Sequence, residues 1–314
     1  MPIEEPAPFF AEVADAPDGA EARWLRTADG VRLRSVVWPQ GERGTAFLFS
    51  GRTEYAEKYG RTARRFAARG LAVATLDWRG QGLSDRYAPN PKLGYVEDFR
   101  QFQQDVAALL GAAPVRALPK PWYLVSHSMG GAIALRSLLE RSDFAGAVFC
   151  APMWQLKMAT ATRELTNRAT QLAQLLGLGA KRLPGTSDEP TALANGFDGN
   201  LLTSDPEQYA WVQTQVRDHP ELGLGGPSLQ WTRAALQEIA RLYVAPLPRL
   251  PVLVLLGAEE EVVAPGVIRH QTALMPQAEL AVFSGARHEL FLERPAIQDE
   301  LWAAFDGFLA RASG

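Results

Sequence analysis

The fold is decided by one stretch, Trp122-Tyr123-Leu124-Val125-Ser126-His127-Ser128-Met129-Gly130-Gly131. Its apolar start predicts a buried strand, and the residues from Met129 onward predict a helix. The Ser-x-Ser-x-Gly pattern between them is a nucleophile elbow, in which a tight strand-to-helix turn lifts the Ser128 hydroxyl over the end of a sheet. The unpaired N–H groups at the helix start favour negative charge there. Ser126 stands where this turn commonly carries glycine.

Short apolar runs on both sides of the elbow predict further strands, and amphipathic patterns lie between most of them. The predicted strands are residues 31–38, 45–49, 71–76, 122–125, 146–150, 252–256 and 280–283, and the predicted helices are 57–68, 97–110, 129–141, 267–275 and 297–310. Near-continuous apolar strands separated by crossover helices indicate a parallel sheet covered on both faces. The predicted fold class is therefore α/β, with a mostly parallel central sheet.

This alternation stops at Pro152 and resumes near Leu250. Helical spacing of apolar residues, a glycine-rich stretch and two more helical patterns, near 207–216 and 228–243, fill the interval. We predict a helical cap at residues 152–246, inserted into a core of residues 25–151 and 247–314 that follows an N-terminal extension, 1–24. A set of long crossover helices is the alternative.

A serine needs a positioned base to become a nucleophile. Of the four histidines, His288 is the predicted base, because residues 284–289 follow the last predicted strand and should form a loop at the carboxyl edge of the sheet. We expect His127, inside the elbow, to face away from Ser128 and to make local packing and hydrogen-bond contacts. A solvated or structural role is predicted for His219 and His270.

An acid must orient the base and stabilise its imidazolium. The strand at 252–256 runs into Gly257-Ala258-Glu259-Glu260-Glu261, and the spacing from the glycine favours Glu260. The order Ser128, Glu260, His288 is the one that an α/β-hydrolase sheet requires. A run of charges is usually a solvated loop, which is the expectation for Glu259 and Glu261, and either remains an alternative acid.

The tetrahedral intermediate also needs hydrogen-bond donors for its oxyanion. One predicted donor is the backbone N–H of Met129. The second is the backbone N–H of Arg52, in the loop Ser50-Gly51-Arg52-Thr53-Glu54 after the strand at 45–49, where Gly51 permits a close turn. An ordinary structural turn is the alternative for this loop.

These motifs together resemble the serine α/β-hydrolase superfamily and, within it, the lysophospholipase and monoacylglycerol lipase group. The resemblance spans about residues 25–310, is weak across the cap, and departs from the family at Ser126 and at Glu260, where glycine and aspartate are usual. The segments that carry it are Ser50-Gly51-Arg52-Thr53-Glu54-Tyr55 with Lys58-Tyr59, Asp77-Trp78-Arg79-Gly80-Gln81-Gly82-Leu83-Ser84, His127-Ser128-Met129-Gly130-Gly131 and Gly285-Ala286-Arg287-His288-Glu289-Leu290.

The resemblance implies the α/β-hydrolase fold and a carboxylic-ester hydrolase that works through an acyl-enzyme on single-chain lipids such as lysophospholipids or monoacylglycerols. Gly51, Arg52 and Trp154 are the expected substrate-binding residues, with Arg52 facing a phosphate. Acyl transfer, thioester hydrolysis and peptide hydrolysis use the same triad and stay open, as does a non-catalytic binding protein on this scaffold.

Composition excludes several other classes. The chain of 314 residues has 32 Lys and Arg against 35 Asp and Glu, a net charge of −3, which argues against a nucleic-acid partner. Its single cysteine, Cys150, excludes a disulfide scaffold and a cysteine-ligated zinc site, and no metal or cofactor is implied. Without a signal peptide or an apolar run of about 18 residues, the expected location is cytoplasmic. Peripheral contact of the cap with the inner face of a membrane stays open, and the oligomeric state is not set.

Overall fold

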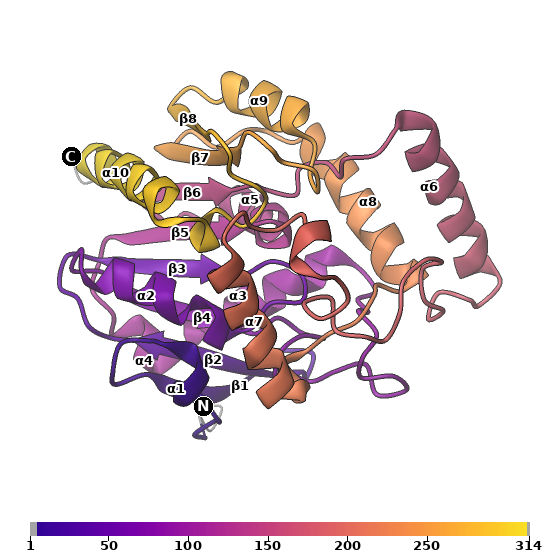
Figure 1. Ribbon diagram of the computed structural model, residues 1–314, viewed down its shortest axis with the longest axis horizontal. Helices are drawn as coiled ribbons and strands as arrows, with labels where there is room; N and C mark the ends of the chain where they lie inside the picture. The colour runs from indigo at the N-terminus through magenta and orange to yellow at the C-terminus, as the bar shows by residue number, and fades with distance from the viewer. Residues whose placement is uncertain (1–4, 313–314) are drawn as a thin grey trace.

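Eight strands form a single sheet in the computed structural model, which describes residues 5–312 (Figure 1). Their order is β1-β2-β4-β3-β5-β6-β7-β8; β2 is antiparallel to both of its neighbours, and the other pairs are parallel. This confirms the predicted α/β class with a mostly parallel sheet. The strands are β1 (Glu21–Arg26), β2 (Arg32–Trp38), β3 (Thr45–Phe49), β4 (Ala72–Leu76), β5 (Trp122–His127), β6 (Gly146–Cys150), β7 (Val252–Gly257) and β8 (Ala278–Phe283).

Strand β1 is absent from the sequence-based prediction. It pairs with β2 at the edge of the sheet, and most of its side chains are half-buried or exposed. Charged residues interrupt its sequence, so the apolar signal that revealed the central strands is missing there. It also crosses the predicted boundary between extension and core, and residues 1–4 of that extension lie outside the described residues.

Helices cover both faces of the sheet, as the crossover pattern predicts. On one face lie α2 (Gly60–Ala67) and α10 (Pro295–Ala312), where Phe66 meets Trp302 edge-on with ring centroids 5.0 Å apart. On the other lie α3 (Phe102–Gly111) and α5 (Met129–Glu140), which contact each other. The short helix α4 (Ala113–Arg116) contacts α3, and α9 (Pro265–Leu274) contacts β8. Another short helix, α1 (Ala11–Ala14), precedes β1 in the chain.

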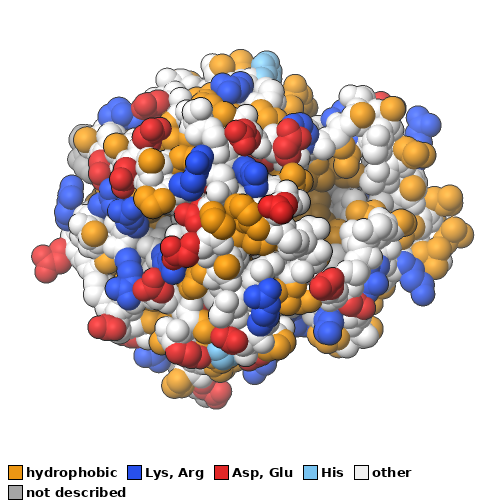
Figure 2. Space-filling view, in the orientation of Figure 1, with side chains coloured by type: hydrophobic (Ala, Val, Ile, Leu, Met, Phe, Trp, Pro, Cys, Tyr) orange, Lys and Arg blue, Asp and Glu red, His pale blue; other side chains and the backbone are white. Residues whose placement is uncertain are grey.

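Three α-helices lie between β6 and β7 in the chain, in the interval predicted to be a cap. They are α6 (Thr160–Leu175), α7 (Pro206–Asp218) and α8 (Leu229–Tyr243). Helices α6 and α8 contact each other and form a lobe beside the sheet (Figure 1), while α8 also contacts α5. Figure 2 shows a hollow between this lobe and the rest of the molecule, with hydrophobic side chains inside it.

A buried ion cluster connects β2 with the segments that follow β3 and β4. Arg34 of β2 pairs with Glu57, 2.6 Å away, and with Asp77, 2.7 Å away, and all three side chains are fully buried. The other Asp77 oxygen accepts the N–H of Ala56. The cluster therefore joins β2, the end of β4 and the 3-10 helix η1 (Ala56–Tyr59), which follows the predicted oxyanion loop.

Candidate active site

Ser128 occupies the turn between β5 and α5, with φ 50° and ψ −117°. This left-handed backbone is uncommon for a residue other than glycine and is typical of a strained elbow. A Cβ on Gly130 would lie 2.0 Å from the Phe49 carbonyl oxygen, so only glycine fits after the turn. Ser126 replaces the usual glycine without a clash, and its hydroxyl donates to the Val148 carbonyl at 3.2 Å.

The residues predicted as nucleophile, base and acid form one hydrogen-bonded chain. Nε2 of His288 lies 2.9 Å from Oγ of Ser128, and Nδ1 of His288 lies 2.8 Å from Oε2 of Glu260. His288 follows β8 and Glu260 follows β7, so the adjacent carboxyl ends of these strands bring both to the elbow. Both side chains are buried.

Glu260 is distinguished from its two neighbours by its contacts. Its Oε1 accepts the backbone N–H groups of Val262 at 2.6 Å and Val263 at 3.0 Å. Burial raises its pKa, but the hydrogen bonds and the charge interaction with His288 outweigh burial and lower the pKa of Glu260 below its ordinary value. Glu259 and Glu261 are exposed, and Glu261 pairs with Lys157. Of the three glutamates, Glu260 alone reaches His288.

Two unpaired backbone donors lie near Ser128, one at the first residue of α5 and one in the loop after β3. Within residues 5–312, neither the N–H of Met129 nor that of Arg52 has a hydrogen-bond acceptor. The N–H of Gly51, by contrast, is bound by the Glu54 carboxylate. The two predicted oxyanion donors are thus free to bind a ligand, and Gly51 contributes conformation only.

A second loop holds this oxyanion loop in place. The Gln81 side chain donates to the Gly51 carbonyl at 3.0 Å and accepts the Thr53 N–H at 3.1 Å. The Trp78 indole donates to the Ser50 carbonyl at 2.9 Å. The segment 77–84, which the sequence analysis matched only by resemblance, therefore sets the position of residues 50–53.

A pocket of about 290 Å³ lies over Ser128 and His288. Its walls come both from core loops and from the interval between β6 and β7, including Thr191, Leu201 and Tyr209. Arg52 lines this pocket and is half-buried.

The Arg52 guanidinium lacks a countercharge. It donates to the Gly225 carbonyl at 2.9 Å and to the Thr191 hydroxyl at 3.4 Å, and it lies over the Trp231 ring. No carboxylate in the described part of the chain pairs with it. Burial lowers the pKa of Arg52 to about 10, which still leaves it charged at neutral pH.

Of the predicted substrate-binding residues, Arg52 lines the Ser128 pocket, whereas Gly51 and Trp154 do not. The Trp154 indole is buried edge-on against Phe149, with ring centroids 5.0 Å apart. A tryptophan directly after a core strand is as easily a packing residue as a ligand contact, and here it packs.

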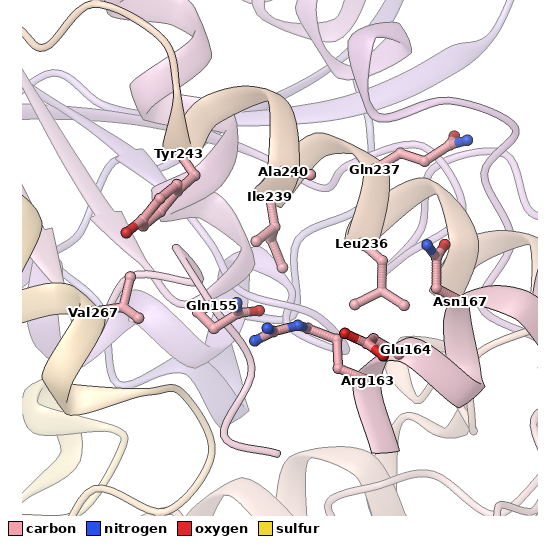
Figure 3. A pocket seen from close by; sticks show the side chains of 10 residues that line it. All are labelled: Gln155, Arg163, Glu164, Asn167, Leu236, Gln237, Ile239, Ala240, Tyr243 and Val267. Carbon is pink, nitrogen blue, oxygen red and sulfur yellow. The ribbon is translucent and has the colours of Figure 1, made fainter. Parts of the chain in front are cut away.

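A larger cleft, of about 540 Å³, lies apart from the triad (Figure 3). Side chains of α6 and α8 line it together with Gln155 and Val267, and it contains none of Ser128, Glu260 and His288. Because the reacting hydroxyl opens into the smaller pocket, that pocket is the candidate active site.

Sequence reasoning missed a buried charged cluster in the wall of this pocket. Lys58 bridges Glu54 at 2.9 Å and Glu289 at 2.7 Å, and His127 contacts Glu54 at 3.0 Å. The resemblance had drawn attention to Glu54 and Lys58 in the motif but assigned them no role. His127 was expected to make local contacts, but its hydrogen-bond partners, Glu54 and the His288 carbonyl, lie 73 and 161 positions away in the chain.

The described residues contain no group of three or more His, Cys, Asp or Glu side chains arranged to hold a metal ion. Over the same residues, no helix is long and apolar enough to cross a membrane. Cys150 is a free, buried thiol, and burial raises its pKa well above the ordinary value.

Comparison with known proteins places this site in a family. A family model described as serine aminopeptidase, S33 matches residues 40–295. The chain is 28% identical to a probable lysophospholipase L2 of Haemophilus influenzae over 98% of this chain and 95% of that protein. It is 28% identical to a monoacylglycerol lipase of Mycolicibacterium smegmatis, covering 84% and 88% of the two chains.

Among solved structures, a soluble variant of monoglyceride lipase from Saccharomyces cerevisiae superimposes with a TM-score of 0.72. The sequences are 21% identical, and the match covers 92% of this chain and 94% of that one. At this identity the likeness concerns the fold alone, and it confirms the α/β-hydrolase fold that the family resemblance implied.

Proposed function

We propose that this chain, which belongs to the serine aminopeptidase S33 family and is a serine hydrolase of the α/β-hydrolase fold, cleaves the ester bond of single-chain lipids. The observation that carries the proposal is the hydrogen-bonded chain from Ser128 through His288 to Glu260. Relatives named lysophospholipase and monoacylglycerol lipase support the substrate class.

In the proposed reaction, Nε2 of His288 accepts the proton of the Ser128 hydroxyl while Oγ attacks the ester carbonyl carbon. Glu260 holds the Nδ1–H of His288 and stabilises the imidazolium that forms. The N–H groups of Met129 and Arg52 donate to the oxyanion, and each such donor is typically worth about 10²–10³ in rate. His288 then protonates the leaving alcohol, and water attacks the acyl-enzyme by the same route.

Labelling with a fluorophosphonate probe tests the nucleophile directly. We expect the wild-type chain to react and to hydrolyse short esters, and Ser128→Ala to do neither. Ser126→Ala is the matched control, since its hydroxyl lies in the same turn but is hydrogen-bonded to the Val148 carbonyl. A wild-type chain that neither reacts nor hydrolyses esters would instead favour the non-catalytic binding protein.

A peptidase is the second candidate, because the description of the matching family names one. An aminopeptidase needs a carboxylate for the substrate ammonium group. The carboxylates that line the pocket, Glu54 and Glu289, already have partners, since Lys58 bridges both of them and Glu54 also contacts His127. Comparing aminoacyl amides, lysophospholipids, monoacylglycerols and acyl thioesters at equal concentration discriminates these activities, and faster turnover of the amides would reverse the preference.

We propose further that Arg52 binds the phosphate of a lysophospholipid. A cation that lines the pocket, partly desolvated and without a carboxylate partner, favours an anionic ligand. Arg52→Ala should lower kcat/KM for a lysophospholipid at least tenfold more than for a monoacylglycerol of the same chain length. Because the substitution leaves the backbone N–H in place, equal losses on both substrates would contradict the phosphate contact.

The helices between β6 and β7 support two proposals about the predicted cap, residues 152–246. This segment supplies Thr191, Leu201 and Tyr209 to the pocket wall, which suits a cover over the substrate. It also carries a row of exposed leucines on and just after α6: Leu165, Leu172, Leu175, Leu176 and Leu178. We propose that this row contacts a lipid surface, and Figure 2 shows hydrophobic side chains along the edge of the lobe.

Co-sedimentation with phospholipid vesicles tests the lipid contact. Leu172→Gln with Leu175→Gln should release the protein from vesicles while leaving turnover of a soluble ester unchanged. Leu274→Gln is the matched control, because Leu274 is 56% exposed on α9, away from α6. Equal vesicle binding by wild type and double variant would contradict the proposed contact.

A further inference from the structure

His127 lies at the end of β5, directly before Ser128, and its ring joins two loops. Its Nδ1 is 3.0 Å from Oε1 of Glu54, the last residue of the oxyanion loop. Its Nε2 is 3.2 Å from the backbone carbonyl oxygen of His288. His127 is only 4% exposed, so both contacts of its ring are buried.

Glu54 is held as a carboxylate and acts only as an acceptor. It receives hydrogen bonds from the Lys58 ammonium group at 2.9 Å, from the Tyr59 hydroxyl and from the Gly51 N–H. Burial raises its pKa, but Lys58 and His127 outweigh burial and lower the pKa of Glu54 well below its ordinary value. Its contact with His127 therefore requires a proton on Nδ1.

The other ring nitrogen also faces an acceptor, because a backbone carbonyl cannot donate. A neutral imidazole has one N–H and would direct the lone pair of its second nitrogen at the His288 carbonyl. An imidazolium donates from both nitrogens and satisfies both partners. The two contacts are thus compatible with each other only in the doubly protonated form.

We propose that His127 is a buried imidazolium that ties the oxyanion loop to the loop of the base, and that it is a positioning residue for the hydrolysis proposed above. Through Glu54 it acts on Gly51, whose neighbour Arg52 supplies a proposed oxyanion donor. Through the His288 carbonyl it acts on the base. The positioning role rests on the proposed function, whereas the protonation state of His127 does not depend on it.

The charges around His127 support this state. Glu54 and Glu289 carry two negative charges, and Lys58 with a protonated His127 carries two positive ones, so the buried cluster is neutral. Burial lowers the pKa of His127, but the Glu54 carboxylate outweighs burial and raises that pKa above its ordinary value. The remaining titratable neighbours are the His288 ring, with its centroid 4.8 Å away, and the thiol of Cys150, the β6 residue paired with His127.

Nitrogen-15 NMR of histidine-labelled protein tests the protonation state without reference to activity. The chain has only four histidines, and a His127→Gln variant identifies the signals of His127. We expect both ring nitrogens of His127 to carry protons at pH 7, and the exposed His270 supplies signals for comparison in the same spectrum. A single protonated nitrogen on His127 at pH 7 would overturn the proposal.

Kinetics test the positioning role. In His127→Gln we expect kcat on a short ester to fall at least tenfold and KM to stay within about twofold, because alignment rather than binding is lost. His270→Gln should match wild type in both constants. A fall of less than tenfold in the kcat of His127→Gln overturns the positioning role.

Failure of this inference is distinguishable from failure of the proposed function. If the wild-type chain shows no fluorophosphonate labelling and no hydrolysis, the proposed function falls, and the NMR result still decides the charge state. If His127→Gln does not fold, the wild-type spectrum alone decides, because it needs no variant with an altered core once His219, His270 and His288 are assigned.

Discussion

Exchange of Glu260 for Gln should prevent His288 from acting as the base, although residue 260 keeps its hydrogen-bond partners. The amide oxygen of Gln is needed by the N–H groups of Val262 and Val263, which contact Oε1 at 2.6 and 3.0 Å. The amide nitrogen then replaces Oε2, 2.8 Å from Nδ1 of His288, and donates to it. Nδ1 must accept, so the proton moves to Nε2, which can no longer take the proton of Ser128.

Wrong-tautomer substitutions of this kind lower kcat by about 10⁴. At about 1.36 kcal/mol per factor of ten, that is about 5 kcal/mol of transition-state stabilisation. The assay is steady-state hydrolysis of a short chromogenic ester, with thermal unfolding to verify that Glu260→Gln folds. Glu259→Gln and Glu261→Gln are matched controls one residue away and should keep full turnover, since both side chains are exposed.

Retention of a tenth or more of wild-type kcat by Glu260→Gln would refute this reasoning. So would loss of turnover in either neighbour with Glu260→Gln fully active, because the acid would then be one of the exposed glutamates. A uniform loss in all three variants would mean that the loop conformation, rather than the His288 contact, had been disturbed.

Three further predictions concern stability. Gly130→Ala should destabilise the chain by about 3 kcal/mol in urea unfolding, because its Cβ would lie 2.0 Å from the Phe49 carbonyl oxygen, whereas Gly266→Ala, with open space around the new methyl group, should be neutral or stabilising. Arg34→Met should reduce the free energy of unfolding by about 3–5 kcal/mol, because it leaves two buried carboxylates without their cation; a change below about 1 kcal/mol would contradict this. The pKa of Glu260 is lowered in the folded chain, so its contribution to stability is present above the ordinary value of 4.5 and is lost as the pH falls through the folded value. Urea unfolding between pH 7 and pH 3 should therefore show a smaller acid-induced loss of stability in Glu260→Gln than in wild type, and equal losses would argue against a lowered pKa.

The sheet and the elbow were readable because they depend on neighbours in the chain. Runs of apolar residues predict buried strands wherever both faces are covered, and the elbow is marked by consecutive residues of one short segment. The collision that requires Gly130, by contrast, is with the carbonyl of Phe49 in another strand. Strand β1 could not be predicted, because this edge strand carries polar side chains and lacks an apolar run. It is recognised as a strand only through its pairing with β2 in the structure. Trp154 shows the opposite error, since an aromatic side chain next to a site can equally well belong to the core.

The sequence by itself determined the fold class, the strained serine turn, and the order in which serine, acid and histidine follow three sheet strands. Only the tertiary structure decided which of three adjacent glutamates reaches His288 and what surrounds His127. These choices depend on contacts between residues 28 and 73 positions apart in the chain. Such contacts produce no periodic pattern in the sequence, because they are made between loops that the sheet brings together. Which charged side chains are buried, and therefore need a partner, depends on that arrangement of the loops.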